Sequence, residues 1–105
     1  MKPLALFVAA AAASLSGAAA LAADAQQLLK DKACLACHVV DKKLVGPSYK
    51  EVAAKYRSRK DAEAYLVKKI KGGSTGVWGP VPMPPNATVN DGDAKTLAKY
   101  ILTLK

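Results

Sequence analysis

Five consecutive residues, Cys34-Leu35-Ala36-Cys37-His38, constrain this chain more than any other feature of its sequence. The spacing Cys-x-x-Cys-His is the attachment signature of a c-type haem. Two thiols three positions apart can add to the two vinyl groups on one edge of a porphyrin. The adjacent histidine then lies beneath the ring, where it can bind the iron. The motif therefore predicts thioether attachment at Cys34 and Cys37 and an axial ligand at His38.

Three other interpretations of the two cysteines compete with haem. A thioredoxin-like redox pair also has the spacing Cys-x-x-Cys, but it is expected within a strand–helix–strand pattern, which this sequence lacks. A structural zinc site needs four ligands, whereas the sequence has only two Cys and one His. A disulfide across two intervening residues would pair the thiols but would leave the histidine unexplained. We therefore favour haem.

The N-terminal segment is typical of an export signal rather than of a folded domain. A basic start at Lys2 is followed by an uninterrupted apolar stretch at residues 4–13 and by mostly small residues at 14–23. The triplet Ala20-Leu21-Ala22 fits the small-x-small pattern of a signal peptidase site. The apolar stretch is shorter than the about 20 residues that a membrane-spanning helix needs.

We therefore expect a signal peptide at residues 1–23, cleaved after Ala22 or Ala23, and a mature domain at residues 24–105 with no membrane span. A retained first helix that anchors the domain to the membrane is the alternative. Cleavage would leave about 82 residues. Below about 80 residues an apolar core alone stabilises a domain by only a few kcal/mol. A mature chain of this size is therefore expected to need a prosthetic group.

The spacing of apolar residues predicts four helices and no β-strand of useful length. Residues 25–32 favour a short first helix, and the Gly46-Pro47 turn precedes a second. Gly72-Gly73 ends a third helix that opens at Asp61, and Asn90 caps a fourth. The positions expected to be buried recur at helical spacing: Tyr49, Val52, Ala53 and Tyr56, then Ala62, Leu66 and Ile70, then Ala94, Leu97, Ala98, Ile101 and Leu104.

One long loop separates the third and fourth helices. Residues 72–89 contain four Gly and four Pro without periodicity, and so long an irregular segment is uncommon in a small domain unless it has a function. Met83, the only methionine of the expected mature chain, lies between prolines that stiffen the backbone. A lone methionine is usually adaptable core filler, but no second histidine is available here. We therefore predict that Met83 is the second axial ligand.

Four stretches of the chain resemble the small bacterial class I cytochromes c of the c-551/c-552 type. They are residues 34–38, residues 43–56, Gly76-Val-Trp-Gly-Pro-Val-Pro-Met-Pro-Pro-Asn86 and residues 95–102. The resemblance covers nearly all of residues 24–105. It implies an all-α monohaem fold, with about four helices around the haem and a long methionine loop rich in Pro and Gly. It also implies one haem c bound covalently through Cys34 and Cys37, with His38 and Met83 as axial ligands.

The resemblance implies roles for further positions around the haem. The carbonyl of Pro47 accepts a hydrogen bond from the second ring nitrogen of His38, which fixes the tautomer of a ligand. The indole N–H of Trp78 donates to a haem propionate, and Asn86 contacts the methionine side of the haem. Lys69 stands where the family often has an arginine that holds a propionate, and a lysine lacks the bidentate geometry of arginine.

The charge of the chain restricts its partners. A net charge of +8, from 16 Lys or Arg against 8 Asp or Glu, excludes an acidic carrier and disfavours strongly basic partners. Six lysines lie in the half of the chain around the haem motif: Lys30, Lys32, Lys42, Lys43, Lys50 and Lys55. As a set they should attract acidic redox proteins and speed encounter with them. Nucleic acid is disfavoured because no recognition motif is present.

The family resemblance implies a periplasmic one-electron carrier that transforms no substrate. Such a carrier, which we expect to be a monomer, passes electrons between a membrane quinol-oxidising complex and a terminal reductase or oxidase. The alternative is a gas-binding or peroxidatic haem protein with a labile sixth ligand, which would need Met83 to be off the iron.

Overall fold

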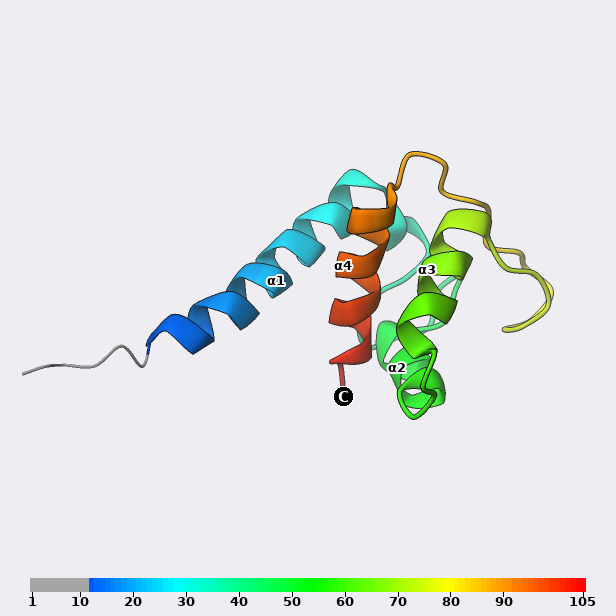
Figure 1. Cartoon of the computed structure of the whole chain (residues 1–105). Coiled ribbons are helices and arrows are strands. Elements are labelled where there is room, and N and C mark those ends of the chain that lie inside the picture. Colours follow the sequence, from blue (N-terminus) through cyan, green and yellow to red (C-terminus); the bar gives the residue numbers. More distant parts are fainter. Residues whose placement is uncertain (1–11) are drawn as a thin grey trace, which may run out of the picture.

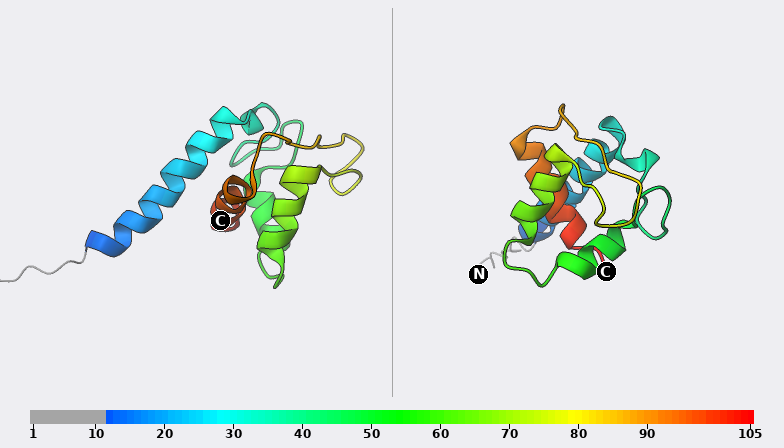
Figure 2. Two further views of the ribbon diagram at one scale, coloured as in Figure 1. Left: turned by 45° about the horizontal axis from the view of Figure 1, so that its top comes forward. Right: turned by 90° about the vertical axis from the view of Figure 1, so that its right-hand side faces the viewer.

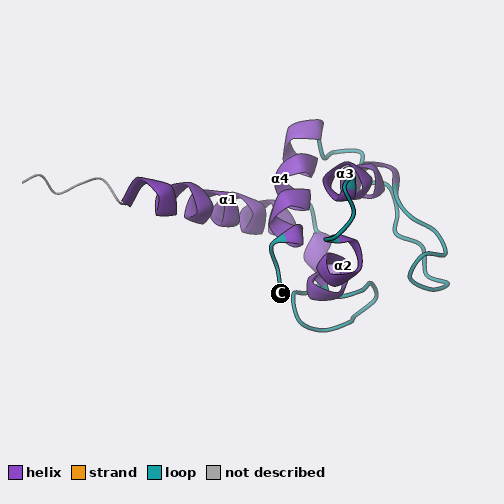
Figure 3. Ribbon diagram, turned by 60° about the horizontal axis from the view of Figure 1, so that its bottom comes forward, coloured by secondary structure: helices purple, strands orange, loops and turns teal. Residues whose placement is uncertain are grey.

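The computed structural model describes residues 12–105, and within this range it consists of helices and loops without a β-strand (Figures 1 and 3). The elements in chain order are α1 (Ala12–Asp31), a short 3₁₀ helix (Cys34–Ala36), α2 (Tyr49–Tyr56), α3 (Ala62–Gly72) and α4 (Asp91–Leu102). The predicted all-α fold with four helices and one large loop is confirmed.

Helix α4 lies at the centre of the fold and packs against α1, α2 and α3 (Figure 1). Its predicted buried stripe is confirmed for Ala94, Leu97, Ala98 and Ile101. Leu104, beyond the end of the helix, is half-buried. Tyr100 is also buried, although the predicted stripe did not include it. The predicted cap is present, because the side chain of Asn90 accepts a hydrogen bond from the backbone N–H of Asp93 at 2.8 Å.

Helices α2 and α3 bury the faces that their spacing predicts. All seven predicted positions on the two helices are buried: Tyr49, Val52, Ala53, Tyr56, Ala62, Leu66 and Ile70. Ser48 caps the N-terminus of α2, because its hydroxyl accepts a hydrogen bond from the backbone N–H of Glu51. Asp61 precedes α3, but its carboxylate is bound by the guanidinium of Arg59 instead of capping the helix.

The first helix is longer than residues 25–32, the range predicted for it. Helix α1 spans Ala12–Asp31, because the alanine-rich segment before residue 25 has a high helix propensity. Among the residues of α1 whose burial is described, from Gly17 on, the first buried one is Ala25, and Leu29 follows one turn later. The expected signal peptide lies partly outside the described residues, at 1–11. Within residues 12–105, no helix combines the length and apolar character that crossing a membrane requires.

Two irregular segments, residues 37–48 and residues 73–90, join the helices on the side away from the start of α1. Figure 2 shows the 73–90 loop extending beyond α3, opposite the direction in which α1 projects. The loop is fastened to the first part of the chain by Lys32, whose ammonium group donates to the backbone carbonyl of Thr88 at 3.0 Å. The two segments bring residues that are far apart in the sequence to one region.

Candidate haem site

A cavity of about 510 Å³ lies between the four helices and the two irregular segments. Each helix contributes a buried aliphatic side chain to its wall, for example Leu29, Val52, Leu66 and Leu97. The cavity falls within the size range of cofactor sites, which are mostly apolar with a few placed polar groups. Its walls therefore suit a large, flat and mainly apolar ligand such as a porphyrin.

The structure brings all of the predicted site residues to this one cavity. Its lining includes Cys34, Cys37, His38, Pro47, Trp78, Met83 and Asn86. These residues come from the 3₁₀ helix and from both irregular segments. The cavity thus holds two thiols, an imidazole and a thioether, the donor set that a covalently bound haem with His and Met ligands requires.

The two cysteines lie on either side of a single tight turn. The backbone N–H of Cys37 donates to the carbonyl of Cys34 at 3.2 Å, and the N–H of His38 donates to the same carbonyl at 3.0 Å. Ala33, just before the turn, has a φ of 60° in the left-handed region, which is uncommon for alanine. The turn holds both thiols and the imidazole at one end of the cavity.

The state of the thiols disfavours the alternative interpretations of the motif. Both cysteines are free rather than joined in a disulfide. Burial raises the pKa of the Cys34 thiol, whereas a redox-active cysteine pair needs a depressed pKa. Among the described residues, no three His, Cys, Asp or Glu side chains lie close enough to form a metal site by themselves. The motif therefore fits haem attachment better than zinc or thiol redox chemistry.

The imidazole of His38 is oriented by two neighbours. Its Nδ1 lies 2.8 Å from the backbone carbonyl oxygen of Pro47, the contact that the family resemblance implies. Since a carbonyl only accepts, Nδ1 carries the proton and Nε2 keeps its lone pair for a metal. The ring of Tyr49 stacks on the imidazole with the centroids 5.1 Å apart. Burial raises the pKa of Tyr49, so its phenol stays neutral beside the ligand.

Gly46 also lines the cavity, although its sequence context predicts only a turn. A Cβ atom at this position would lie 2.6 Å from Cε1 and 2.9 Å from Nδ1 of His38. Both distances are shorter than any ordinary contact between such atoms. The backbone at Gly46 therefore packs directly against the imidazole, and only glycine fits. The Gly-Pro pair in the sequence is a signal for a turn, but it does not reveal this contact.

Replacement of Gly46 by alanine is expected to lower the free energy of unfolding by about 1–3 kcal/mol, because the added methyl group overpacks the site. The displaced imidazole should also change the reduction potential. Gly72→Ala is the matched control, since a Cβ atom there meets no other atom within 4 Å. Denaturant titration and potentiometry of both variants test this. Equal free energies of unfolding and equal reduction potentials in the two variants would show that Gly46 does not position His38.

Met83 is held by its backbone. Its N–H donates to the carbonyl of Ser74 at 2.8 Å, and its carbonyl accepts from the N–H of Ser74 at 3.0 Å. Met83 itself is half-buried at the cavity wall. The sequence indicated stiffness from the neighbouring prolines, but it did not indicate the pairing with Ser74. The backbone of Met83 is thus fixed by Ser74, although the side chain of Met83 is itself flexible.

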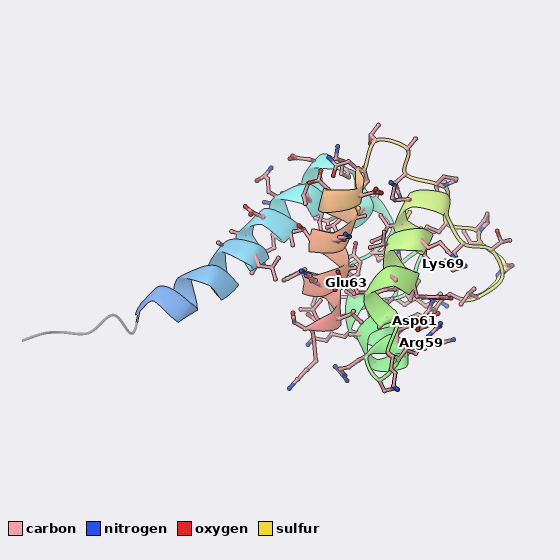
Figure 4. All side chains as sticks on the ribbon, viewed as in Figure 1. Arg59, Asp61, Glu63 and Lys69 are labelled. Carbon is pink, nitrogen blue, oxygen red and sulfur yellow. The ribbon has the colours of Figure 1, made fainter. Side chains whose placement is uncertain are left out.

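Three further side chains line the cavity near the 73–90 loop. The ring of Trp78 meets Tyr56 edge-on, with the centroids 6.2 Å apart. The side-chain amide of Asn86 donates to the carbonyl of Ile70 at 2.9 Å, which ties the loop to α3. Lys69 also lines the cavity, and Figure 4 shows it on the side of α3 nearest the loop. Their roles toward a propionate or toward the methionine side of the haem stay predictions.

The comparison with known proteins agrees with this geometry. The model of the cytochrome c family, described as "Cytochrome c", matches residues 22–105.

The chain belongs to the cytochrome c family.

Its relatives include cytochrome c-551 of Pseudomonas aeruginosa, 53% identical over the whole length of both chains. Cytochrome c-552 of Nitrosomonas europaea is 57% identical, over 90% of this chain and 91% of the relative. The crystal structure of wild-type Nitrosomonas europaea cytochrome c552 superposes with a TM-score of 0.75 at 59% identity. That match covers 76% of this chain and 99% of the solved chain.

Family membership establishes the cofactor and the class of the protein. The chain is a small class I c-type cytochrome of the c-551/c-552 type, from a family of electron carriers. Such a cytochrome carries one covalently attached haem c, and the two cysteines at the cavity wall suit that attachment. The resemblance found in the sequence is therefore confirmed.

Proposed function

We propose that this cytochrome c is an exported one-electron carrier of the periplasm. The observation that carries the proposal is the single cavity in which Cys34, Cys37, His38 and Met83 meet. The cysteines would hold the haem through two thioethers, and the haem would supply an iron centre that gains or loses one electron. With both axial positions taken by protein side chains, the iron has no coordination position for a substrate. The protein would then carry electrons without acting as an enzyme.

His38 and Met83 are the proposed axial ligands. The hydrogen bond from Nδ1 of His38 to Pro47 leaves Nε2 free to bind iron. The paired backbone of Met83 holds the thioether at the cavity wall. A gas-binding or peroxidatic protein would need Met83 to leave the iron, and no observation favours that alternative.

Export is proposed from the burial pattern of α1. The core of the domain begins at Ala25 and Leu29, which are buried against the rest of the fold. Cleavage after Ala22 or Ala23 would leave these residues in place and would remove exposed helix such as Gly17 and Ala20, together with Ala22, which is half-buried against the core. Residues 1–23 are therefore proposed to be a signal peptide and residues 24–105 the mature domain.

The proposed docking face surrounds the opening of the cavity. Four aliphatic side chains are exposed there while also lining the cavity: Leu44, Val45, Val77 and Val81. Lys43 is exposed at the same rim. An apolar patch with a basic border suits acidic redox partners, for which we propose a membrane quinol-oxidising complex as donor and a terminal reductase or oxidase as acceptor. The carrier would act as a monomer and would not bind nucleic acid.

Reversal of the charge at Lys43 is expected to slow electron transfer to an acidic redox protein about two- to tenfold at low salt, because local charge mainly sets the association rate. The difference should shrink as ionic strength rises, since charges are screened beyond about 8 Å at physiological salt. Stopped-flow kinetics of Lys43→Glu over a range of salt concentrations measure this. The reduction potential should stay nearly constant.

Lys99→Glu is the matched control, because Lys99 is exposed on α4 and does not line the cavity. The same reversal at Lys32 should also slow transfer, but it would break the hydrogen bond to Thr88 as well. Lys43 therefore provides the cleaner test. Equal slowing by Lys43→Glu and Lys99→Glu would mean that total charge, and no particular face, governs encounter.

A further inference from the structure

The stiff, proline-rich backbone around Met83 does not by itself fix the position of the Met83 sulfur. Methionine has three rotatable side-chain bonds and adapts easily to its surroundings. The position of its sulfur therefore depends on how firmly the backbone is fastened. Pro82, Pro84 and Pro85 have no N–H, so Met83 carries the one backbone donor of residues 82–85.

The fastening comes from the C-terminal end of α3. Ser74 exchanges two backbone hydrogen bonds with Met83, using both backbone polar groups of the methionine. Three residues later, the backbone N–H and the side-chain amide of Asn86 both donate to the carbonyl of Ile70, at 3.2 and 2.9 Å. By contrast, residues 75–82 make no backbone hydrogen bond to other parts of the described chain. The loop is thus held at its return, around Met83, rather than along its outward half.

Gly73 makes this attachment sterically feasible. It follows the last residue of α3, with a φ of 84° and a ψ of 179°, a region that is essentially restricted to glycine. A Cβ atom on Gly73 would lie 2.6 Å from the carbonyl oxygen of Met83 and 3.0 Å from the nitrogen of Pro85. Both are backbone atoms, so neither can rotate away. The backbone of Met83 therefore reaches the end of α3 only because residue 73 has no side chain.

We propose that Gly73 and Ser74, together with the contact between Asn86 and Ile70, form an anchor that holds Met83 on the iron, with Gly73 as its positioning residue. We call this set the methionine anchor. The proposal rests on the proposed role of Met83 as a ligand and adds what determines the strength of that ligation. Loosening the anchor should let an added ligand displace the sulfur more easily while the haem stays attached through Cys34 and Cys37.

The chain offers a matched control for Gly73. Gly76 also has a positive φ, of 76°, but a Cβ atom there would meet nothing within 4 Å. Alanine at either position places a side chain in backbone of positive φ, and only Gly73→Ala adds a collision with the backbone of Met83. The difference between the two variants thus reports the contact of residue 73 with the backbone of residues 83–85.

The test is imidazole binding to the oxidised holoprotein, followed in the visible spectrum well below the melting midpoint of each variant. Gly73→Ala is expected to bind imidazole about tenfold more tightly than the wild type. Overpacking at residue 73 destabilises the state in which Met83 is bound to the iron, and a destabilisation of the usual size changes the binding equilibrium by about tenfold. Its methionine-to-iron(III) absorption band should weaken. Gly76→Ala should stay within about twofold of the wild type, because no protein atom outside the adjoining residues lies within 4 Å of the added methyl group. Equal imidazole affinities of the two variants would overturn the proposal.

A second measurement needs no variant. In the wild-type holoprotein, hydrogen exchange at the backbone amide of Met83 should be slow, because that amide donates to Ser74, whereas the amides of Val77 and Val81 should exchange quickly. Equally fast exchange at all three amides would also overturn the anchor. If the wild-type protein has no methionine-to-iron band at all, the proposed ligand role of Met83 fails instead, whatever Gly73 does.

Discussion

Replacement of Met83 by alanine is expected to abolish the weak far-red absorption band of the oxidised protein that a methionine sulfur bound to iron(III) produces. His and Met ligation raises the potential of a haem iron. We therefore expect the reduction potential to fall by on the order of 0.1–0.3 V, within the range of about 0.8 V over which axial ligands set haem potentials. The open coordination position should also let the iron bind small ligands. Visible spectroscopy and potentiometry of the holoprotein measure these changes.

Two further variants separate the loss of the sulfur from the loss of packing. Met83→Leu keeps the volume of the side chain, and such swaps usually cost less than about 1.5 kcal/mol. It should lose the band as completely as Met83→Ala. Val81→Ala lies in the same loop and changes an exposed side chain, so it should keep the band. Persistence of the band in both Met83 variants would mean that another group is the sixth ligand.

The helical part of the fold could be predicted because each helix buries one face. Val52 and Tyr56 recur one turn apart on α2, as do Leu97 and Ile101 on α4, and all four are buried. Such spacing is a local property of the sequence, and burial of the apolar face follows from it. Tyr100 was missed because it lies beside the predicted stripe, where its burial depends on α1: its hydroxyl accepts a hydrogen bond from Gln26 at 3.3 Å.

The start of α1 could not be placed from periodicity. The alanine-rich segment before Ala25 has no apolar and polar faces to distinguish, yet alanine favours helix wherever it stands. Within the described residues, helix α1 therefore extends back to Ala12, well before Ala25, the first residue described there as buried. A signal for peptidase cleavage is a chemical pattern and does not need to coincide with the end of a helix.

The close backbone contacts around the cavity could not be predicted from the sequence for a different reason. Cys34, Cys37 and His38 could be named because their spacing alone carries the chemistry. The contact of Gly46 with His38 and that of Gly73 with Met83 depend on which backbone segments meet after folding. A glycine in the sequence indicates only that the chain turns there or that something approaches closely, and the structure is needed to say what approaches.

The structure also shows why the haem should decide whether the domain folds. Buried residues from every helix, including Leu29, Val52, Leu66 and Leu97, line the cavity as well as belonging to one hydrophobic core cluster. At about 24 cal/mol per Å³, leaving a cavity of about 510 Å³ unfilled would cost up to about 12 kcal/mol. The opening of the cavity to water makes this an upper bound. A small domain has only about 5–15 kcal/mol of stability in total, so even a part of this loss would remove a large share of it.

The double variant Cys34→Ala, Cys37→Ala, prepared without haem, is therefore expected to be largely unfolded, with little helical circular dichroism and no cooperative melting. Alanine changes little at these two half-buried positions, so the missing haem and not the substitution should be the cause. Addition of free haem is the control, because His38 and Met83 remain as ligands and should restore part of the helicity. Native-like helicity with a cooperative melt in the haem-free variant would refute this explanation. The four helices would then form a stable core around an empty cavity, and the haem would add function without completing the fold.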